Sequence, residues 1–334
     1  MSDVRRKLLL VAAGMAVAST ALAQTWPAKP VRFISTFGSG SPADALMRLV
    51  GQKIAEPLGQ PVIVETQAGA GGLLGAQAVL RAAPDGHTYL YTISTTLVTT
   101  PHLVKARPVE MKDFAAVITM AKAYTCMLAA SSFGPNSVRE LIAYAKANPG
   151  KVAYGSNGVG GTYHLEMEMI KQKHGVDITH VPYKGGNDGL MSAAAGNIPV
   201  AFAPCSSITP QARAGKVKFL AVLEMRRAPD YPDVPAMGEQ LPDYEKISGG
   251  TDIWAPAQVP ATIVRRLHAE IDKVLAQPDV RARMKEIGFP YDGTALEDMA
   301  AQRRKDYEIA GRAVKVADRK STRLNSSHGY ISYA

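Results

Sequence analysis

A short apolar strand, a glycine- and serine-rich loop and a helix follow one another near the start of the chain, and this unit limits the folds that the sequence can adopt. Residues 31–34 (VRFI) are typical of a buried strand, while Ser41 and Pro42 are typical of a helix N-cap and of the first helical position. The unit recurs along residues 62–93. This alternation predicts an α/β fold with a parallel sheet and right-handed crossovers.

A second α/β set follows a long apolar segment at residues 115–130, which we interpret as strand material that crosses into a second domain. Residues 252–255 are interpreted as a strand that returns to the first domain. We therefore predict two domains and two crossovers, although no internal repeat is sharp enough to identify the halves as duplicates. The predicted domains are residues 25–125 together with 246–318, and residues 126–245.

The N-terminus has the pattern of a secretory signal peptide. Basic residues at positions 5–7 precede an apolar stretch at residues 8–17 and a small-residue cleavage site that ends at Ala23. The apolar stretch is too short to remain as a membrane anchor. We predict that residues 1–23 are a signal, cleaved after Ala23, and that the mature protein is periplasmic. The paired arginines leave the general and the twin-arginine export routes both open.

The formal net charge of +9 is partly concentrated at the two ends of the chain, because the signal and residues 319–334 are both basic. The body between them contains no dense run of Lys or Arg, so a nucleic-acid partner is not predicted. The last helix is expected to end near Asp318. Residues 319–334 are serine-rich and have no period, so we predict a disordered or non-native tail.

The two cysteines, Cys126 and Cys205, could pair in an oxidising compartment, but a sequence does not show whether they are close. Both lie beside apolar runs, and we therefore expect buried free thiols. The chain lacks the ligand spacing of a metal cluster, and no metal or cofactor is predicted.

Two glycine-rich loops open helices in the two halves, at residues 37–41 and 155–162. Such a loop directs backbone N–H groups outward at the positive end of a helix, which suits an anion; a plain tight turn is the alternative. Because each half has such a loop, we predict that they face each other across a cleft and clamp a ligand with acidic ends. The turn at residues 183–186 offers Lys184 and two N–H groups, with a solvated turn as the alternative.

Asp44 lies in the first turn of the predicted helix that follows the first loop. We interpret its carboxylate as a structural group that stabilises the helix dipole. A contact with an amino group of a ligand is the alternative.

A dinucleotide-binding interpretation has weak support. The glycines at positions 69, 71 and 75 follow a predicted strand, but the next strand ends in Ser94 and Thr95 instead of the acidic residue that binds a ribose. We expect these glycines to serve close backbone packing.

An exported hydrolase is the alternative function, with Ser39 or Ser156 as the nucleophile. The chain has no Gly-x-Ser-x-Gly motif and no evident base for either serine. His164 and Glu168 lie four residues apart without a His-Glu-x-x-His pattern, so a helical surface pair is favoured over a metal site.

Several short motifs, in this order, resemble those of a known family. They are residues 26–32 (WPAKPVR), 69–76 (GAGGLLGA), 83–88 (APDGHT), 147–151 (ANPGK), 154–156 (YGS), 180–186 (HVPYKGG), 214–217 (AGKV) and 232–235 (PDVP). Together they are similar to Bug-type proteins, the periplasmic solute-binding components of tripartite tricarboxylate transporters. The resemblance covers roughly residues 25–318.

This resemblance implies a two-lobed type II periplasmic-binding-protein fold that closes on a small carboxylate, without catalysis or cofactor. It implies a monomer that delivers its ligand to the membrane subunits of the transporter. The residues that it assigns to the ligand site, with Asp44 added, are Phe37, Gly38, Ser39, Gly40, Ser41, Asp44, Ser94, Thr95, Ser156, Asn157, Gly158, Gly160, Gly161, Thr162, Tyr183, Lys184, Gly185 and Gly186.

The sequence also departs from the family pattern at three places near the predicted cleft. Ser41 follows Gly40 where the family has two adjacent glycines, Pro204 replaces a common Asp, and Gly250 replaces a common Trp. These differences leave the identity of the ligand open.

Overall fold

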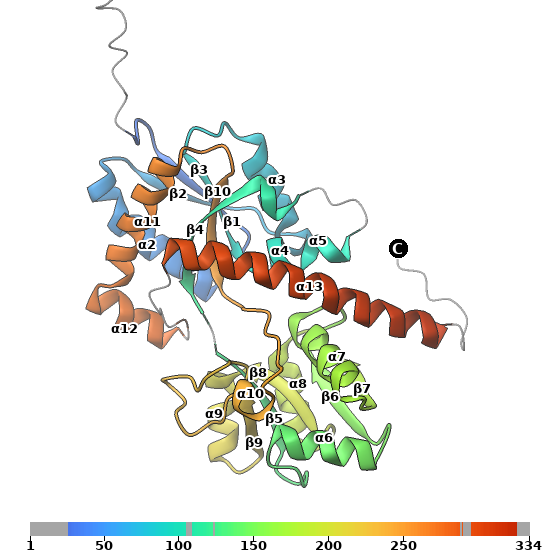
Figure 1. The fold of residues 1–334 in the computed structure, drawn as a ribbon. Helices are drawn as coiled ribbons and strands as arrows, with labels where there is room; N and C mark the ends of the chain where they lie inside the picture. The colour runs from blue at the N-terminus through green and yellow to red at the C-terminus, as the bar shows by residue number, and fades with distance from the viewer. Residues whose placement is uncertain (1–25, 105–108, 123, 288, 290–294, 326–334) are drawn as a thin grey trace, which may run out of the picture.

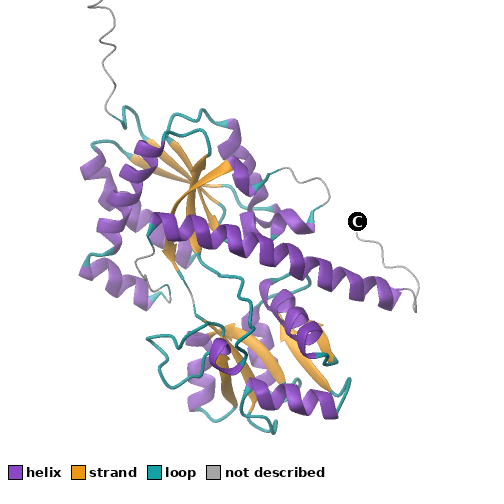
Figure 2. Ribbon diagram, viewed as in Figure 1, coloured by secondary structure: helices purple, strands orange, loops and turns teal. Residues whose placement is uncertain are grey.

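The computed structural model describes residues 26–104, 109–122, 124–287, 289 and 295–325, and the chain forms two lobes (Figure 1). Each lobe contains a five-stranded sheet with helices packed around it (Figure 2). The α/β class and the two-lobed architecture that the sequence predicted are confirmed.

The first lobe takes its sheet from both ends of the chain. Its strands are Val31–Ser35 (β1), Val62–Thr66 (β2), Thr88–Ile93 (β3), Phe114–Ala121 (β4) and Thr251–Pro256 (β10), in the spatial order β2-β1-β3-β10-β4. β1 pairs in parallel with β2 and β3, whereas β10 is antiparallel to β3 and β4. The strands of the recurring unit, β1, β2 and β3, are thus parallel as predicted, whereas the sheet as a whole is mixed. β10 arrives from the second lobe and not through a crossover helix, so nothing imposes parallel pairing on it.

The helices of the first lobe pack around this sheet. They are Pro42–Leu58 (α2), Leu73–Arg81 (α3), Thr95–Val98 (α4), Thr100–Leu103 (α5), Ala261–Leu275 (α11), Pro278–Glu286 (α12) and Leu296–Asn325 (α13), with 3₁₀ turns at Ala70–Gly72 (η1) and Met111–Asp113 (η2). α2 begins as its sequence predicts: Pro42 occupies the first turn and the Ser41 hydroxyl accepts a hydrogen bond from the Asp44 N–H. Its buried face, including Met47 and Ile54, packs into the same core as Leu267 of α11.

The second lobe repeats the strand order of the first. Its strands are Thr125–Ala130 (β5), Val152–Ser156 (β6), Ile178–Pro182 (β7), Val200–Pro204 (β8) and Val217–Val222 (β9), in the order β7-β6-β8-β5-β9. Its helices are Val138–Ala147 (α6), Thr162–His174 (α7), Gly186–Ala194 (α8), Cys205–Arg213 (α9) and Met237–Gln240 (α10). β7, β6 and β8 are parallel, and β5 is antiparallel to β8 and β9.

The chain crosses between the lobes twice, between β4 and β5 and between β9 and β10, as predicted. In each sheet the strand that arrives from the other lobe occupies the same position. β10 lies beside β3, and β5 lies beside β8. The two lobes thus share a topology that no sequence repeat indicated.

α13 spans both lobes and continues further than expected (Figure 1). Ile309 and Ala313 of this helix share an apolar cluster with Val98 of α4 and Leu165 of α7, which belong to different lobes. The helix continues to Asn325, so residues 319–325 are helical and the expected end near Asp318 is corrected. The rest of the predicted tail and the predicted signal peptide lie outside the described residues.

Cys126 and Cys205 form a disulfide, so the expectation of free thiols is wrong. The two Cα atoms are 5.2 Å apart, because β5 lies beside β8 and α9 begins where β8 ends. Both side chains are fully buried, which is the part of the expectation that holds. A separation of 79 residues in the chain gave the sequence no means of showing this proximity.

The glycine loop at residues 69–76 serves backbone packing, as expected. A Cβ atom at Gly75 would lie 2.8 Å from a methyl group of Thr36 and 3.1 Å from the Gln67 carbonyl oxygen. Within the described part of the chain, no helix combines the length and apolar character needed to cross a membrane.

Candidate functional site

A cleft of about 210 Å³ lies between the two lobes. Side chains of both lobes and both crossing segments line it. These residues are Phe37, Ile93, Thr95, Lys122, Thr125, Asn157, Thr162, Tyr163, Glu166, Leu223, Glu224, Lys246, Ile247, Gly249, Gly250, Thr251 and Phe289. The two glycine-rich loops therefore contribute to one crevice, Phe37 from the first and Asn157 and Thr162 from the second.

Four of the residues assigned from the sequence line this cleft: Phe37, Thr95, Asn157 and Thr162. The others lie in the same loops or beside them, without lining the cleft in this conformation. They are Gly38, Ser39, Gly40, Ser41, Asp44, Ser94, Ser156, Gly158, Gly160, Gly161, Tyr183, Lys184, Gly185 and Gly186.

The first loop has backbone N–H groups that are exposed and make no hydrogen bond with the described residues. Phe37 packs its ring against Tyr91 with the centroids 5.0 Å apart, and its backbone N–H donates to Ser35 Oγ. Gly38 and Ser39 are exposed, and no contact among the described residues engages their N–H groups. The Ser39 hydroxyl contacts Thr66 Oγ1 at 3.0 Å instead of pointing alone into solvent. This loop therefore offers an anion backbone donors.

Asp44 is held inside the first loop and does not line the cleft. Its Oδ2 accepts hydrogen bonds from the Gly40 N–H at 2.9 Å and from Arg48 Nε at 3.0 Å. Burial opposes its ionisation, but the bonds from Arg48 and Gly40 outweigh burial and lower the pKa of Asp44. These contacts support the structural interpretation, in which Asp44 fixes the shape of the loop.

Ser94 and Thr95 differ although they are adjacent. Ser94 is fully buried, and both its hydroxyl and its N–H bind the second crossing segment, at the carbonyl oxygens of Ser248 and Gly250. Thr95 is half-buried and faces the cleft. Ser94 thus anchors the connection between the lobes, and Thr95 is the one that can contact a ligand.

The second loop uses its own N–H groups internally. The N–H of Gly158 donates to Ser156 Oγ at 3.1 Å and that of Gly161 to the Gly158 carbonyl oxygen at 3.1 Å. The Gly160 N–H donates to His164 Nδ1 at 3.1 Å. The Tyr163 N–H donates to Asn157 Oδ1, which leaves the amide NH₂ of Asn157 as the donor group of that side chain. The second loop therefore offers side-chain donors, from Asn157 and Thr162.

The turn at residues 183–186 serves packing in the second lobe. The Tyr183 hydroxyl donates to Ser192 Oγ at 2.6 Å. A Cβ atom at Gly186 would lie 3.0 Å from the Phe202 carbonyl oxygen, so this glycine lets α8 approach β8 closely. Lys184 is exposed. None of these four residues lines the cleft, and their role in ligand binding stays a prediction.

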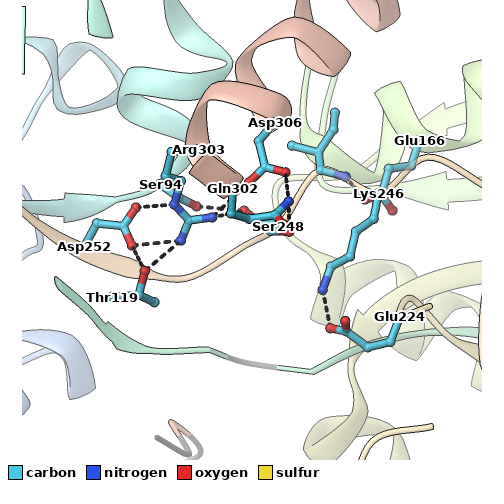
Figure 3. Close-up of polar contacts among 11 residues, drawn as sticks. Ser94, Thr119, Glu166, Glu224, Lys246, Ser248, Asp252, Gln302, Arg303 and Asp306 are labelled. Atoms are coloured by element: carbon cyan, nitrogen blue, oxygen red, sulfur yellow. Dashed lines mark hydrogen bonds and ion pairs between the residues drawn. The ribbon is translucent and has the colours of Figure 1, made fainter. Parts of the chain in front are cut away.

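The crossing segments bring charged side chains to the cleft that the sequence analysis did not assign. Lys122 and Lys246 line it together with Glu224, and Lys246 Nζ forms an ion pair with Glu224 (Figure 3). Glu166 on α7 is buried, and its Oε1 accepts from the Ile247 N–H. Burial raises the pKa of Glu166 to about 8, so the group is neutral at pH 7. The cleft then carries more positive than negative charge.

A buried network holds the second crossing segment against the first lobe (Figure 3). Arg303 of α13 forms a bidentate pair with Asp252 of β10, with both N···O distances at 2.8 Å. Its Nη1 donates to Asp306 and to the carbonyl oxygen of Ser248, and its Nη2 to Thr119. All five N–H groups of the guanidinium have acceptors, so a buried charge is fully compensated.

For the hydrolase alternative, the structure places a candidate base, His180, beside Ser156, but this serine is not accessible as a nucleophile. Ser156 Oγ lies 2.6 Å from His180 Nε2. Ser156 is fully buried, however, and its oxygen is also bound by the Gly158 N–H. Burial and the neighbouring His164 lower the pKa of His180 to about 4, which makes it a weak base. No described carboxylate contacts its Nδ1, so the geometry gives this function no support.

Among the described residues, no group of three or more His, Cys, Asp or Glu side chains is arranged to hold a metal ion. The cleft-lining residues that the sequence analysis missed lie mainly in the crossing segments. The predicted crossovers, near residues 125 and 246, were themselves the signal, since a cleft between two lobes includes the segments that join them.

Comparisons with known proteins agree with this architecture. A model of the tripartite tricarboxylate transporter family receptor matches residues 46–305. A UPF0065 protein of Bordetella pertussis is 36% identical over 268 residues, which cover 79% of this chain and 81% of that protein.

Two solved structures are similar over almost the whole described fold. The periplasmic binding protein BugD is 28% identical, with a TM-score of 0.64, covering 88% of this chain and 99% of BugD. MatC from Rhodopseudomonas palustris, solved with bound malate, is 28% identical with a TM-score of 0.65, covering 86% of this chain and 100% of MatC. The chain belongs to the tripartite tricarboxylate transporter family receptors, the Bug-type solute-binding proteins that its sequence motifs resemble.

Proposed function

We propose that this chain is a periplasmic receptor that binds a small organic carboxylate in the interlobe cleft and delivers it unaltered to the membrane subunits of a tripartite tricarboxylate transporter. The observation that carries the proposal is the cleft itself, in which donors from both lobes surround a net positive site. The malate bound to the related MatC supports the class of ligand.

The two lobes would bind the acid with different groups. The first offers the Thr95 hydroxyl in the cleft and, next to Phe37 in the chain, the N–H groups of Gly38 and Ser39. The second offers the Asn157 amide and the Thr162 hydroxyl. Lys122 and Lys246 supply the opposite charge. A ligand that contacts both lobes stabilises their approach, and the membrane subunits would recognise the closed form.

Calorimetry on stripped protein tests this proposal. The mature chain is unfolded, dialysed and refolded to remove any co-purified acid, which mass spectrometry then identifies. We expect saturable binding of a di- or tricarboxylate such as malate, and at least tenfold weaker binding of the corresponding amide. Equal binding of acid and amide, or no binding of any acid in a panel, would contradict the proposal.

A matched pair of variants assigns the binding to the cleft. Thr162→Val removes a hydroxyl from the cleft, whereas Thr179→Val removes an exposed one from β7. We expect the first variant to bind the acid about fivefold to tenfold more weakly, since one hydrogen bond contributes roughly 1 kcal/mol. The second should match the wild type.

N-terminal sequencing of the periplasmic fraction checks export and cleavage after Ala23.

A further inference from the structure

Two stacked imidazoles contact the second loop. The rings of His164, on α7, and His180, on β7, have their centroids 4.2 Å apart with an interplanar angle of 27°. His164 Nδ1 accepts a hydrogen bond from the Gly160 N–H at 3.1 Å, and His180 Nε2 lies 2.6 Å from Ser156 Oγ. The pair therefore contacts the loop at two points, on either side of its centre.

The loop needs such support because its backbone conformation is unusual. Gly158 and Gly160 have φ angles of +104° and +74°, in the region that favours glycine. Its two cleft-lining side chains, Asn157 and Thr162, stand at the two ends of this segment. A change in the shape of the loop would therefore move both donors relative to a ligand.

We infer that His164 and His180 are positioning residues that hold the loop between Ser156 and Thr162 in the shape that binds ligand. His164 does so by accepting the Gly160 N–H, and His180 by binding Ser156 and by stacking on His164. Neither ring lines the cleft. The inference rests on the proposed function only where it concerns ligand affinity.

This role requires His164 to be neutral. An imidazolium carries a proton on both nitrogens and has no acceptor, so a protonated His164 cannot bind the Gly160 N–H. Burial lowers the pKa of His164, an effect that Lys171 assists and Glu168 opposes. The other ionisable groups around the stack are His180 and Tyr154, and the Glu168 carboxylate is itself bound by Lys171 and by the Tyr154 hydroxyl. The stack is thus neutral at pH 7 and charges only in acid.

Two substitutions at one position separate the acceptor from the ring. His164→Ala removes the acceptor, whereas His164→Asn places an amide oxygen near the position of Nδ1 and does not titrate. We expect His164→Ala to weaken binding of the calorimetrically identified acid about tenfold and His164→Asn to restore most of it. His174→Ala, at the end of the same helix, is the matched control and should leave affinity unchanged.

The pH profile provides a second readout. Wild-type affinity should fall more steeply than that of His164→Asn as the pH drops below 6.5, because both proteins share the titration of the ligand and of His180, and only the wild type can protonate the acceptor at position 164. Parallel profiles would overturn the positioning role of His164.

Amide hydrogen exchange tests the inference without any ligand. The Gly160 amide, followed by NMR in the ligand-free protein, should exchange at least tenfold faster in His164→Ala and at the wild-type rate in His164→Asn. Unchanged exchange in a folded His164→Ala protein would overturn the inference. If no acid bound the wild type while Gly160 exchange responded as expected, the proposed function would fail and the inference about the loop would hold.

Discussion

The two lobes have the same strand order but secure the corresponding strand in different ways. In the first lobe, the strand that arrives from the other lobe is β10, and Asp252 on it pairs with Arg303 of α13. In the second lobe that strand is β5, and Cys126 on it is bonded to Cys205 at the start of α9. All four side chains are buried.

The difference lies in what else each anchor contacts. Arg303 also binds the Ser248 carbonyl oxygen, so the ionic anchor holds the second crossing segment as well as the strand. The disulfide lies within the second lobe, in a cluster with Leu128 and Ile208. The ionic anchor thus binds the second crossing segment through the Arg303 side chain, whereas the covalent anchor meets the first crossing segment only through backbone, by the Cys205 N–H that donates to the Tyr124 carbonyl oxygen. The following variants test that distinction, from the largest expected effect to the smallest.

Arg303→Ala should have the largest effect. It leaves Asp252 and Asp306 buried without their partner, which destabilises a protein by about 3–5 kcal/mol. Both tryptophans of the chain, Trp26 and Trp254, lie in the core of the first lobe, so urea unfolding followed by tryptophan fluorescence reports on that lobe. Arg283→Ala, which breaks an exposed pair, should cost at most about 0.5 kcal/mol. Equal losses of stability in the two variants would show that the Arg303–Asp252 pair does not anchor the strand.

Replacing both cysteines by alanine should destabilise the second lobe by about 2–4 kcal/mol, because the unfolded chain is released from a long closed loop. The tryptophan transition should change little, while the far-UV circular dichroism transition moves to lower urea. Carboxylate affinity should remain within twofold of the wild type. A simultaneous shift of the tryptophan signal would show that the two anchors are not independent.

Glu166→Gln tests how the buried carboxyl group beside the second crossing segment makes the stability of the protein depend on pH. Burial raises the pKa of Glu166 to about 8, above its ordinary value near 4.5, so the folded state holds this proton more tightly than the unfolded state. The folded protein therefore loses stability as pH rises from about 4.5 to 8, and the full loss is present above pH 8. We expect Glu166→Gln to be more stable than the wild type by about 1–3 kcal/mol at pH 8.5 and to be similar at pH 4.5. Thermal melts at both pH values check this; a pH-independent difference would contradict it.

The two loops should give the smallest effects and the clearest contrast. Ser39→Ala leaves the backbone donors of the first loop in place and breaks one exposed contact with Thr66, so ligand affinity should change less than twofold. Asn157→Leu removes a side-chain donor of the second loop and its bond to the Tyr163 N–H, and should weaken binding about tenfold. Calorimetry that gave the reverse order would show that the loops exchange these roles.

Much of the fold could be predicted because local signals are strong where the unit of strand, loop and helix recurs. Ser41 and Pro42 mark the start of α2, and the helix begins there. The direction of β10 and the position of β5 depend on contacts between segments more than seventy residues apart, which local patterns do not encode. The disulfide was missed for the same reason.

The sequence indicated the two loops that contribute to the cleft but not the other residues that line it. The pattern of glycines indicated where both loops lie. It could not show that, in the second loop, His164 accepts the N–H of Gly160 and Ser156 accepts the N–H of Gly158. Lys246 and Glu166 were missed because their role comes from the crossing segments and from burial. A glycine-rich loop predicts available donors only when no side chain nearby accepts them.

The discontinuous first lobe also sets an order of assembly. Every strand of the second lobe lies between residues 125 and 222, so its sheet can form as soon as that stretch has been synthesised. The first sheet lacks its fourth member in spatial order until β10 emerges, and α13 follows later still. The N-terminal strands of the first lobe are therefore made long before Trp254 and Arg303, which complete its core and its buried ion pair.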